Sequence, residues 1–207
     1  MKIAIRVDAG KNTGFGHVKR CLDISKAFQL RNAEICFLTK YYADSYFQDY
    51  DNRRIIIHWL KNDATNVDIY DKNINDATRC LEICDRQGFS PDLFILDCYD
   101  FDITWESIIR QSGAKILLFE DYLERNHCVD FVVSLTAGII DRSHFNQFDE
   151  TLFLVGTDYW ITEFNLIQRP QTKMSQGKKA VLLFFGSSDL KKITEHFLNE
   201  CTRNPNL

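Results

Sequence analysis

The sequence predicts an α/β protein built on a Rossmann-like, doubly wound parallel sheet. Short apolar runs recur along the 207-residue chain, and segments with helical periodicity lie between them. The runs are continuously apolar rather than alternating, which is typical of parallel strands covered on both faces. Alternating strands and helices indicate a doubly wound fold. The predicted strands are Ile3–Val7, Ile35–Leu38, Ile55–Ile57, Leu93–Leu96, Ile116–Phe119, Phe131–Leu135 and Val181–Phe185.

Helices are predicted between these strands. Val18, Cys21 and Leu22 are spaced as one face of a helix that follows the first strand. A long helix is expected over Ile69 to Arg86 and a short one over Trp105 to Gln111. Each predicted helix can therefore return the chain to start the next parallel strand.

A change in composition predicts a domain boundary. Residues 168–178 are polar, contain a Pro and a Gly, and lack periodicity, as expected of a linker. We therefore expect an N-terminal domain over 1–167, and over 179–207 the first strand–helix unit of a second domain, its helix capped by Asp189 or a nearby serine. One strand and one helix cannot enclose a core. The chain is thus expected to be a fragment, or this unit packs on the first domain.

Composition excludes several functions. The net charge is −4 and the basic residues are scattered, which argues against nucleic-acid or anionic-membrane surfaces. No signal peptide or apolar run of about 18 residues is visible, so we expect a cytoplasmic protein without membrane insertion. The seven cysteines are irregularly spaced without a Cys-x-x-Cys pair. They are typical of reduced cytosolic thiols rather than of a disulfide framework or a zinc site.

The turn Gly14-Phe15-Gly16-His17 is the leading functional motif. It follows the first strand and opens a helix, where glycines allow close backbone approach and the helix N-terminus favours an anion. The partial positive charge of the helix N-terminus also favours neutral imidazole, so His17 is a candidate general base. Arg20 follows one turn later and could hold an anion. A turn with two glycines is also a common structural feature, and Arg20 could equally lie on a solvated helix face.

Polar side chains follow three predicted strands. Asp8 follows the first, Asp97 and Tyr99 end the fourth, and Asp121 follows the fifth beside Glu120. The carboxyl ends of parallel strands meet at one edge of the sheet, where ligands bind in open α/β folds. Each residue alone could simply cap a helix or stiffen a turn, and their coincidence favours a site.

These motifs resemble the nucleotide-sugar hydrolase family of pseudaminic acid biosynthesis, whose relatives include spore-coat polysaccharide proteins. The likeness covers nearly the whole chain in order, although Cys98 and Ser187 depart from the family pattern. The matching segments are 1–8, 14–17, 20–21, 95–99, 116–121, 156–159, 163–164 and 185–189.

The resemblance implies the N-terminal half of a two-domain glycosyltransferase-B-like fold. It implies that His17 activates water to release UDP from a diacetamido-trideoxy sugar, with inversion at the anomeric carbon. It implies a UDP-sugar as the partner, no cofactor, no metal and a monomer. The implied substrate-binding residues are Asp8, Gly14, Phe15, Gly16, Arg20, Asp97, Tyr99, Asp121 and Tyr159, and the implied nucleotide-binding residues are Gly186, Ser187 and Ser188.

Two alternatives stay open. A glycosyltransferase of the same fold would turn the His17 loop toward an acceptor instead of water. A non-catalytic relative would keep the scaffold and bind a partner. Most of the expected second domain, which in this fold holds most nucleotide contacts, lies outside the 207 residues. A lone N-terminal half is therefore expected to bind a nucleotide-sugar weakly.

Overall fold

The computed structural model describes residues 1–8, 15–40, 55–60, 68–121, 125–135, 150–159, 161, 183, 185, 189 and 191–203. Within them, one sheet holds seven strands, all parallel, in the order β3-β2-β1-β4-β5-β6-β7. The strands are β1 (Lys2–Val7), β2 (Glu34–Thr39), β3 (Ile55–Trp59), β4 (Leu93–Asp97), β5 (Lys115–Phe119), β6 (Phe131–Ser134) and β7 (Leu152–Val155). The predicted α/β class with a doubly wound parallel sheet is confirmed.

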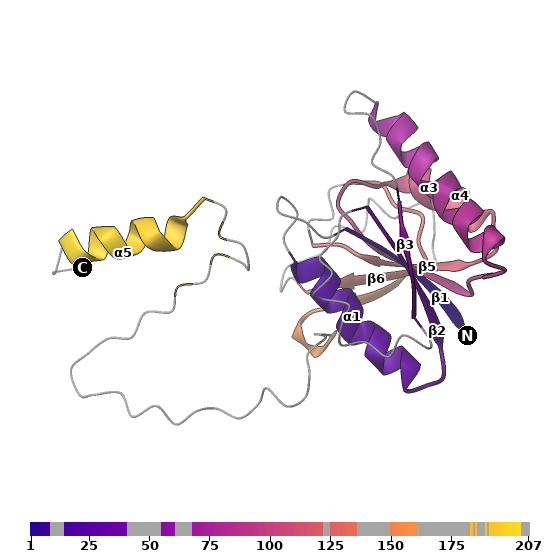
Figure 1. Cartoon of the computed structure of the whole chain (residues 1–207), viewed down its shortest axis with the longest axis horizontal. Helices are drawn as coiled ribbons and strands as arrows, with labels where there is room; N and C mark the ends of the chain where they lie inside the picture. Colours follow the sequence, from indigo (N-terminus) through magenta and orange to yellow (C-terminus); the bar gives the residue numbers. More distant parts are fainter. Residues whose placement is uncertain are drawn as a thin grey trace.

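The helices cover both faces of the sheet. Figure 1 shows α1 (Gly16–Gln29) on one face, and α3 (Ile69–Arg86) with α4 (Ile103–Arg110) on the other. A 3-10 turn, η2 (Thr157–Tyr159), follows β7, and α5 (Ile193–Arg203) has no buried residue. No helix in the described part of the chain is both long and apolar enough to cross a membrane.

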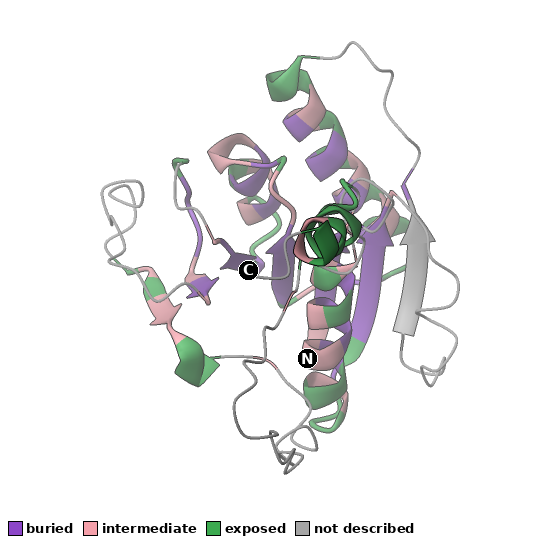
Figure 2. Cartoon of the chain, turned by 90° about the vertical axis from the view of Figure 1, so that its left-hand side faces the viewer, coloured by how far each residue is buried: buried purple, intermediate pink, exposed green. Residues whose placement is uncertain are grey.

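Successive side chains along each strand point to opposite faces of the sheet, and a separate hydrophobic core lies on each face. Ile3 and Ile5 of β1 pack with α1, whereas the intervening Ala4 belongs to the core beneath α3 and α4. The described residues of β1, β2 and β4 are almost all buried, and exposed residues gather on the outer sides of the helices (Figure 2). Apolar strand runs therefore predict burial on both faces correctly.

Most element boundaries agree with the sequence, and the differences have local causes. Helix α3 spans the predicted residues, while α4 begins two residues early because the Asp102 side chain accepts a hydrogen bond from the Thr104 N–H. Strand β7 is a four-residue, partly exposed edge strand that the sequence analysis missed.

The predicted second domain is described only in part. Of the predicted strand Val181–Phe185, only Leu183 and Phe185 are described, and neither is in a strand. The proposed linker, 168–178, lies outside the described residues. The Asp189 carboxylate accepts hydrogen bonds from the N–H groups of Ile193 and Thr194, at 2.9 and 3.0 Å, which confirms it as the predicted cap of α5.

The strand order places the switch point of the sheet between β1 and β4. From β1 the chain continues outward to β2 and β3, and it then returns to β4 on the other side of β1. The connections after β1 and after β4 therefore leave in opposite directions. Open α/β sheets bind their ligands at such a switch point, at the carboxyl ends of the two strands.

Candidate active site at the carboxyl edge of β1 and β4

His17 and Asp97 meet at the switch point. His17 lies in the first turn of α1, and Asp97 is the last residue of β4. The Nδ1 atom of His17 lies 2.6 Å from Oδ1 of Asp97. The Asp97 side chain has no exposed surface, whereas 18% of the His17 side chain is exposed. The carboxylate therefore lies behind the imidazole, and the imidazole faces the edge of the sheet.

The contact decides which nitrogen of His17 can act as a base. Burial by itself would raise the pKa of Asp97, but hydrogen bonds from His17 and Arg20 outweigh burial and lower it. An ionised carboxylate only accepts hydrogen bonds, so Nδ1 carries the proton and donates it. In neutral imidazole, Nε2 then holds the free lone pair. The 3.3 Å approach of Arg20 Nη2 to Nδ1 is therefore a contact without hydrogen-bond character.

Arg20 joins Asp97 to a second carboxylate. Its Nε donates to Oδ2 of Asp97 at 2.9 Å and its Nη2 to Oδ1 at 2.7 Å, which is a bidentate pair. Its Nη1 lies 3.6 Å from Oδ2 of Asp121, and its guanidinium lies over the Phe119 ring, 4.4 Å from the centroid. Burial alone would lower the pKa of Arg20, but the two carboxylates raise it. Arg20 is therefore a fixed positive charge beside His17.

Tyr99 and Asp121 form the outer part of the same group. The Tyr99 hydroxyl donates to Oδ2 of Asp121 at 2.8 Å. The Tyr99 ring meets the His17 ring edge-on, with centroids 4.7 Å apart and an interplanar angle of 86°. The His17 group (His17, Arg20, Asp97, Tyr99 and Asp121) thus combines side chains from α1 and from the ends of β4 and β5.

The N-terminus of α1 lies beside this group. Its N-cap residue is Phe15, whose side chain cannot accept a hydrogen bond, and its first turn contains no acidic residue. A Cβ added to Gly16 would meet no atom of the described residues within 4 Å. The first turn therefore combines the partial positive charge of a helix N-terminus with open space around Gly16.

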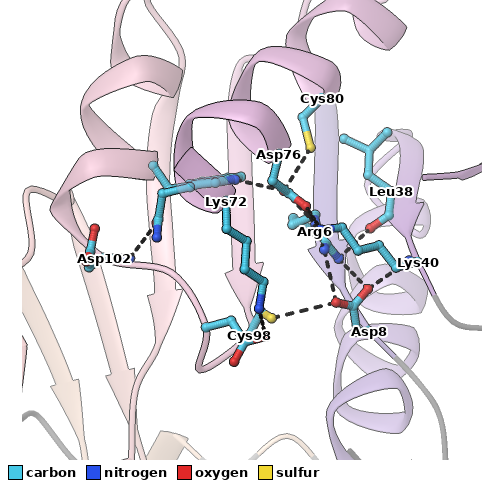
Figure 3. Close-up of polar contacts among 12 residues, drawn as sticks. Arg6, Asp8, Leu38, Lys40, Lys72, Asp76, Cys80, Cys98 and Asp102 are labelled. Carbon is cyan, nitrogen blue, oxygen red and sulfur yellow. Dashed lines mark hydrogen bonds and ion pairs between the residues drawn. The ribbon is translucent and has the colours of Figure 1, made fainter. Parts of the chain in front are cut away.

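Asp8 belongs to a separate, buried group of charges. Its carboxylate accepts from Nη1 and Nη2 of Arg6, at 2.5 and 3.0 Å, and from the backbone N–H of Lys40 at 2.8 Å. Figure 3 shows Arg6 between Asp8 and Asp76. Nε and Nη2 of Arg6 both donate to Asp76 at 2.9 Å, and Lys40 Nζ lies 2.9 Å from Asp76. The predicted role of Asp8 in ligand binding stays a prediction.

The sequence pointed to Asp8 but not to its partners, and together they form the Arg6 group (Arg6, Asp8, Lys40 and Asp76). Arg6 has no exposed surface although it lies within the buried part of β1, which is otherwise apolar after Lys2. A lone arginine in a run expected to be buried on both faces was the available signal, because a buried charge requires a buried partner. The partner, Asp76, is 70 residues away on α3.

Of the remaining predicted site residues, only Tyr159 lies among the described residues. Tyr159 is exposed and follows β7, three strands beyond β4. Gly14, Gly186, Ser187 and Ser188 lie outside the described residues. No cluster of three or more His, Cys, Asp or Glu side chains suited to a metal ion occurs among the residues that the structure describes.

Comparisons with known proteins give distant relatives. No family model matches the chain. The chain is 29% identical over 208 residues to an uncharacterized protein of Methanocaldococcus jannaschii, covering 97% of this chain and 40% of that protein. It is 26% identical over 138 residues to the UDP-2,4-diacetamido-2,4,6-trideoxy-beta-L-altropyranose hydrolase of Campylobacter jejuni, covering 66% of this chain and 42% of the hydrolase. The chain thus spans about two-fifths of the length of these curated relatives.

Two solved structures show partial likeness. MurG of Acinetobacter baumannii has a TM-score of 0.49 at 14% identity, over 75% of this chain and 44% of MurG. A UGT transferase of Siraitia grosvenorii in complex with UDP has a TM-score of 0.45 at 13% identity, over 59% of this chain and 29% of that chain.

Proposed function

We propose that this chain carries the general base of a UDP-sugar enzyme, and that its reaction is hydrolysis of the sugar–UDP bond. The observation that carries the proposal is the 2.6 Å contact between His17 and the buried Asp97 at the switch point of the sheet. The motif resemblance and the 26% identity to the Campylobacter hydrolase support the substrate class. In this proposal the chain is the N-terminal half of a glycosyltransferase-B-like fold.

The proposed chemistry is a single displacement. Nε2 of His17 takes a proton from water while the water oxygen attacks the anomeric carbon. The bond between that carbon and the UDP oxygen breaks, the electron pair leaves with UDP, and the configuration inverts. General base catalysis of this kind contributes about 10²–10⁴ in rate. UDP is a good leaving group, so the step requires no strong acid.

The side chains around His17 carry a net negative charge, which favours a base that becomes positively charged when it takes a proton. The His17 group holds one positive charge on Arg20 and two negative charges on Asp97 and Asp121. The proton that His17 takes from water therefore balances the surplus negative charge. Asp97 orients the imidazole from behind and stabilises imidazolium, as the carboxylate of a catalytic triad does.

The remaining roles follow from position. Tyr99 and Asp121 are proposed to contact the sugar, and the Gly14-Phe15-Gly16 turn is proposed to receive a phosphate. Asp8 and Tyr159 remain proposed substrate contacts. Nucleotide contacts are proposed for the segment Gly186-Ser187-Ser188.

The test compares two histidine variants. The 207-residue chain is incubated with the UDP-sugar that the Campylobacter enzyme's name specifies, and released UDP and free sugar are measured. We expect His17→Gln to lower UDP release by about 10²-fold or more. The control, His196→Gln, changes an exposed histidine of α5 and should leave the rate unchanged. Circular dichroism verifies that both variants fold.

The remaining outcomes would redirect the proposal. Undiminished UDP release by His17→Gln would exclude His17 as the base. A glycoside, formed only when an acceptor is present, would make the enzyme a transferase. Absence of turnover, together with millimolar UDP-sugar binding by calorimetry, would favour a non-catalytic scaffold.

A further inference from the structure

A buried histidine outside the His17 group lies between two carboxylates. Nδ1 of His127 is 2.6 Å from Oε1 of Glu106, and its Nε2 is 3.5 Å from Oε2 of Glu120. The side chains of His127 and Glu106 have no exposed surface, and 8% of the Glu120 side chain is exposed. Two ionised carboxylates buried around one neutral ring would leave uncompensated charge, so the arrangement favours imidazolium.

The histidine connects three separate elements. Glu106 is on α4, Glu120 directly follows β5, and His127 lies in the segment that leads to β6. The other Glu106 oxygen accepts from the backbone N–H of Cys128 at 2.6 Å. The backbone N–H of Glu120 donates to the Val133 carbonyl at 3.1 Å. His127 therefore fixes the end of β5 against α4 and β6.

The same segment reaches both outer residues of the His17 group. Glu120 is the direct neighbour of Asp121. Arg125, two residues before His127, donates from Nη1 to the backbone carbonyls of Tyr99 and Phe101. The segment from Arg125 to Cys128 thus contacts Tyr99 through Arg125, and through His127 it contacts Glu120, the neighbour of Asp121.

We propose that His127 is a positioning residue, which as imidazolium between Glu106 and Glu120 holds Tyr99 and Asp121 in place beside His17. This inference rests on the proposed function for its consequence, because these two residues are the proposed sugar contacts. The positioning itself is a property of the folded chain and can be measured without turnover.

Electrostatics around His127 agree with this geometry. Burial alone would lower the pKa of His127, but hydrogen bonds to Glu106 and Glu120 raise it to about 9. Of the other charged groups on the packed elements, Arg110 of α4 pairs with Asp130 at 3.0 Å and donates to the backbone carbonyl of Cys128 at 3.4 Å. Deprotonation of His127 therefore removes the positive charge that faces Glu106 and Glu120.

The experiment is an NMR titration of the 207-residue chain. Imidazole signals of His127 should titrate near pH 9, and the backbone amide signals of Tyr99 and Asp121 should move with the same midpoint. The amide signal of Asp8, in the Arg6 group, should not follow that midpoint and serves as the internal control. Tyr99 and Asp121 signals that remain still through the His127 titration would overturn the proposal.

Two variants separate positioning from simple stability. Glu120→Gln keeps both contacts of Glu106 and removes the charge facing Nε2, so it should lower the His127 midpoint and shift the Asp121 signal. The matched control, Glu82→Gln, removes a carboxylate from the exposed pair with Arg86 on α3 and should leave the Tyr99 and Asp121 signals in place. If both variants shifted the Tyr99 and Asp121 signals equally, His127 would contribute to stability alone and would have no positioning role.

Turnover adds a separate readout. If the proposed hydrolysis holds, Glu120→Gln should raise KM severalfold with little change in kcat, whereas His17→Gln lowers kcat. A chain that shows the NMR coupling without any turnover keeps the positioning and loses the proposed function. A chain that hydrolyses the UDP-sugar but lacks the NMR coupling keeps the proposed function and loses the positioning role of His127.

Discussion

The imidazole of His17 and the carboxylate of Asp97 are joined across 80 residues of sequence, with Nδ1 and Oδ1 2.6 Å apart. His17 lies in the first turn of α1, and Asp97 is the last residue of β4. Parallel pairing of β1 with β4 aligns Val7 with Asp97. Helix α1 then begins at this edge and places His17 over the carboxylate. The pairing of an orienting carboxylate with a candidate base is thus a product of strand order.

Asp97→Asn should remove most of the activity without removing the fold. An amide can donate to Nδ1 and so leave the proton on Nε2, where it blocks base catalysis. We expect UDP release to fall by about 10²–10⁴. The matched control is Asp23→Asn, which changes a carboxylate that lies on α1, the helix of His17, and pairs with Lys19 at the surface. Equal rates for Asp97→Asn and wild type would show that the dyad is not catalytic.

Gly16→Ala should separate ligand binding from folding. A methyl group there meets no atom within 4 Å in the described part of the chain, and alanine is the better helix former by about 1 kcal/mol. The melting temperature should therefore stay the same or rise slightly. If a phosphate occupies the space beside Gly16, the Kd for UDP-sugar should rise at least tenfold by calorimetry. Unchanged affinity would exclude close approach of the ligand at this residue.

Tyr99→Phe should have a moderate effect on substrate binding. The substitution removes the hydroxyl that donates to Asp121 at 2.8 Å and keeps the ring against His17. One hydrogen bond contributes about 1 kcal/mol, which corresponds to about a fivefold rise in KM. Steady-state kinetics of UDP release measures the change. A loss in kcat of the size expected for His17→Gln would instead give the hydroxyl a chemical role.

Asp76→Asn should be among the most destabilising single substitutions. Asp76 pairs with Arg6 and Lys40 and also accepts from Nε1 of Trp105 at 3.0 Å. Removing one partner of a buried pair costs about 3–5 kcal/mol. Urea unfolding measures this, with Glu82→Gln on the same helix as control. Glu82 is in an exposed pair with Arg86, which contributes at most about 1 kcal/mol. Similar losses of unfolding free energy in both variants would contradict a stabilising role for the buried Asp76 contacts.

Stability should fall at both ends of the pH range. Asp76 and Asp97 have lowered pKa values in the folded state, so their contribution is present above about pH 4 and is lost as pH falls through the folded values. His127 is the opposite case. Its pKa rises from 6.5 to about 9 on folding, so its contribution is complete below about pH 6.5 and is lost as pH rises through 9.

The alkaline loss can be assigned with one variant. A shift of that size corresponds to about 3 kcal/mol at ~1.4 kcal/mol per pKa unit. Wild-type free energy of unfolding, measured by urea between pH 6 and about 10, should fall by a large part of this amount. His127→Gln should be less stable at pH 6 and nearly independent of pH across that window. A parallel decline in both proteins would assign the loss to other groups.

Local sequence predicted the framework well. The apolar run after Met1 and the spacing of Val18, Cys21 and Leu22 predicted β1 and α1, because burial on a sheet requires those patterns. Strand β7 escaped prediction since it is short and lies at the edge. The partners of Arg6 were also beyond local sequence, because an ion pair to a helix 70 residues away depends on packing.

The sequence by itself determined which side chains reach the carboxyl edge, because the carboxyl ends of all parallel strands lie at the same edge of the sheet. Sequence position alone assigns His17, Asp97, Tyr99 and Asp121 to that edge. Only the tertiary structure decided their partners. Placing β4 beside β1 buries Asp97 behind His17, and Arg6 takes Asp8 into a different group. Periodicity sets which face a residue occupies, but the strand order decides which charges must neutralise one another.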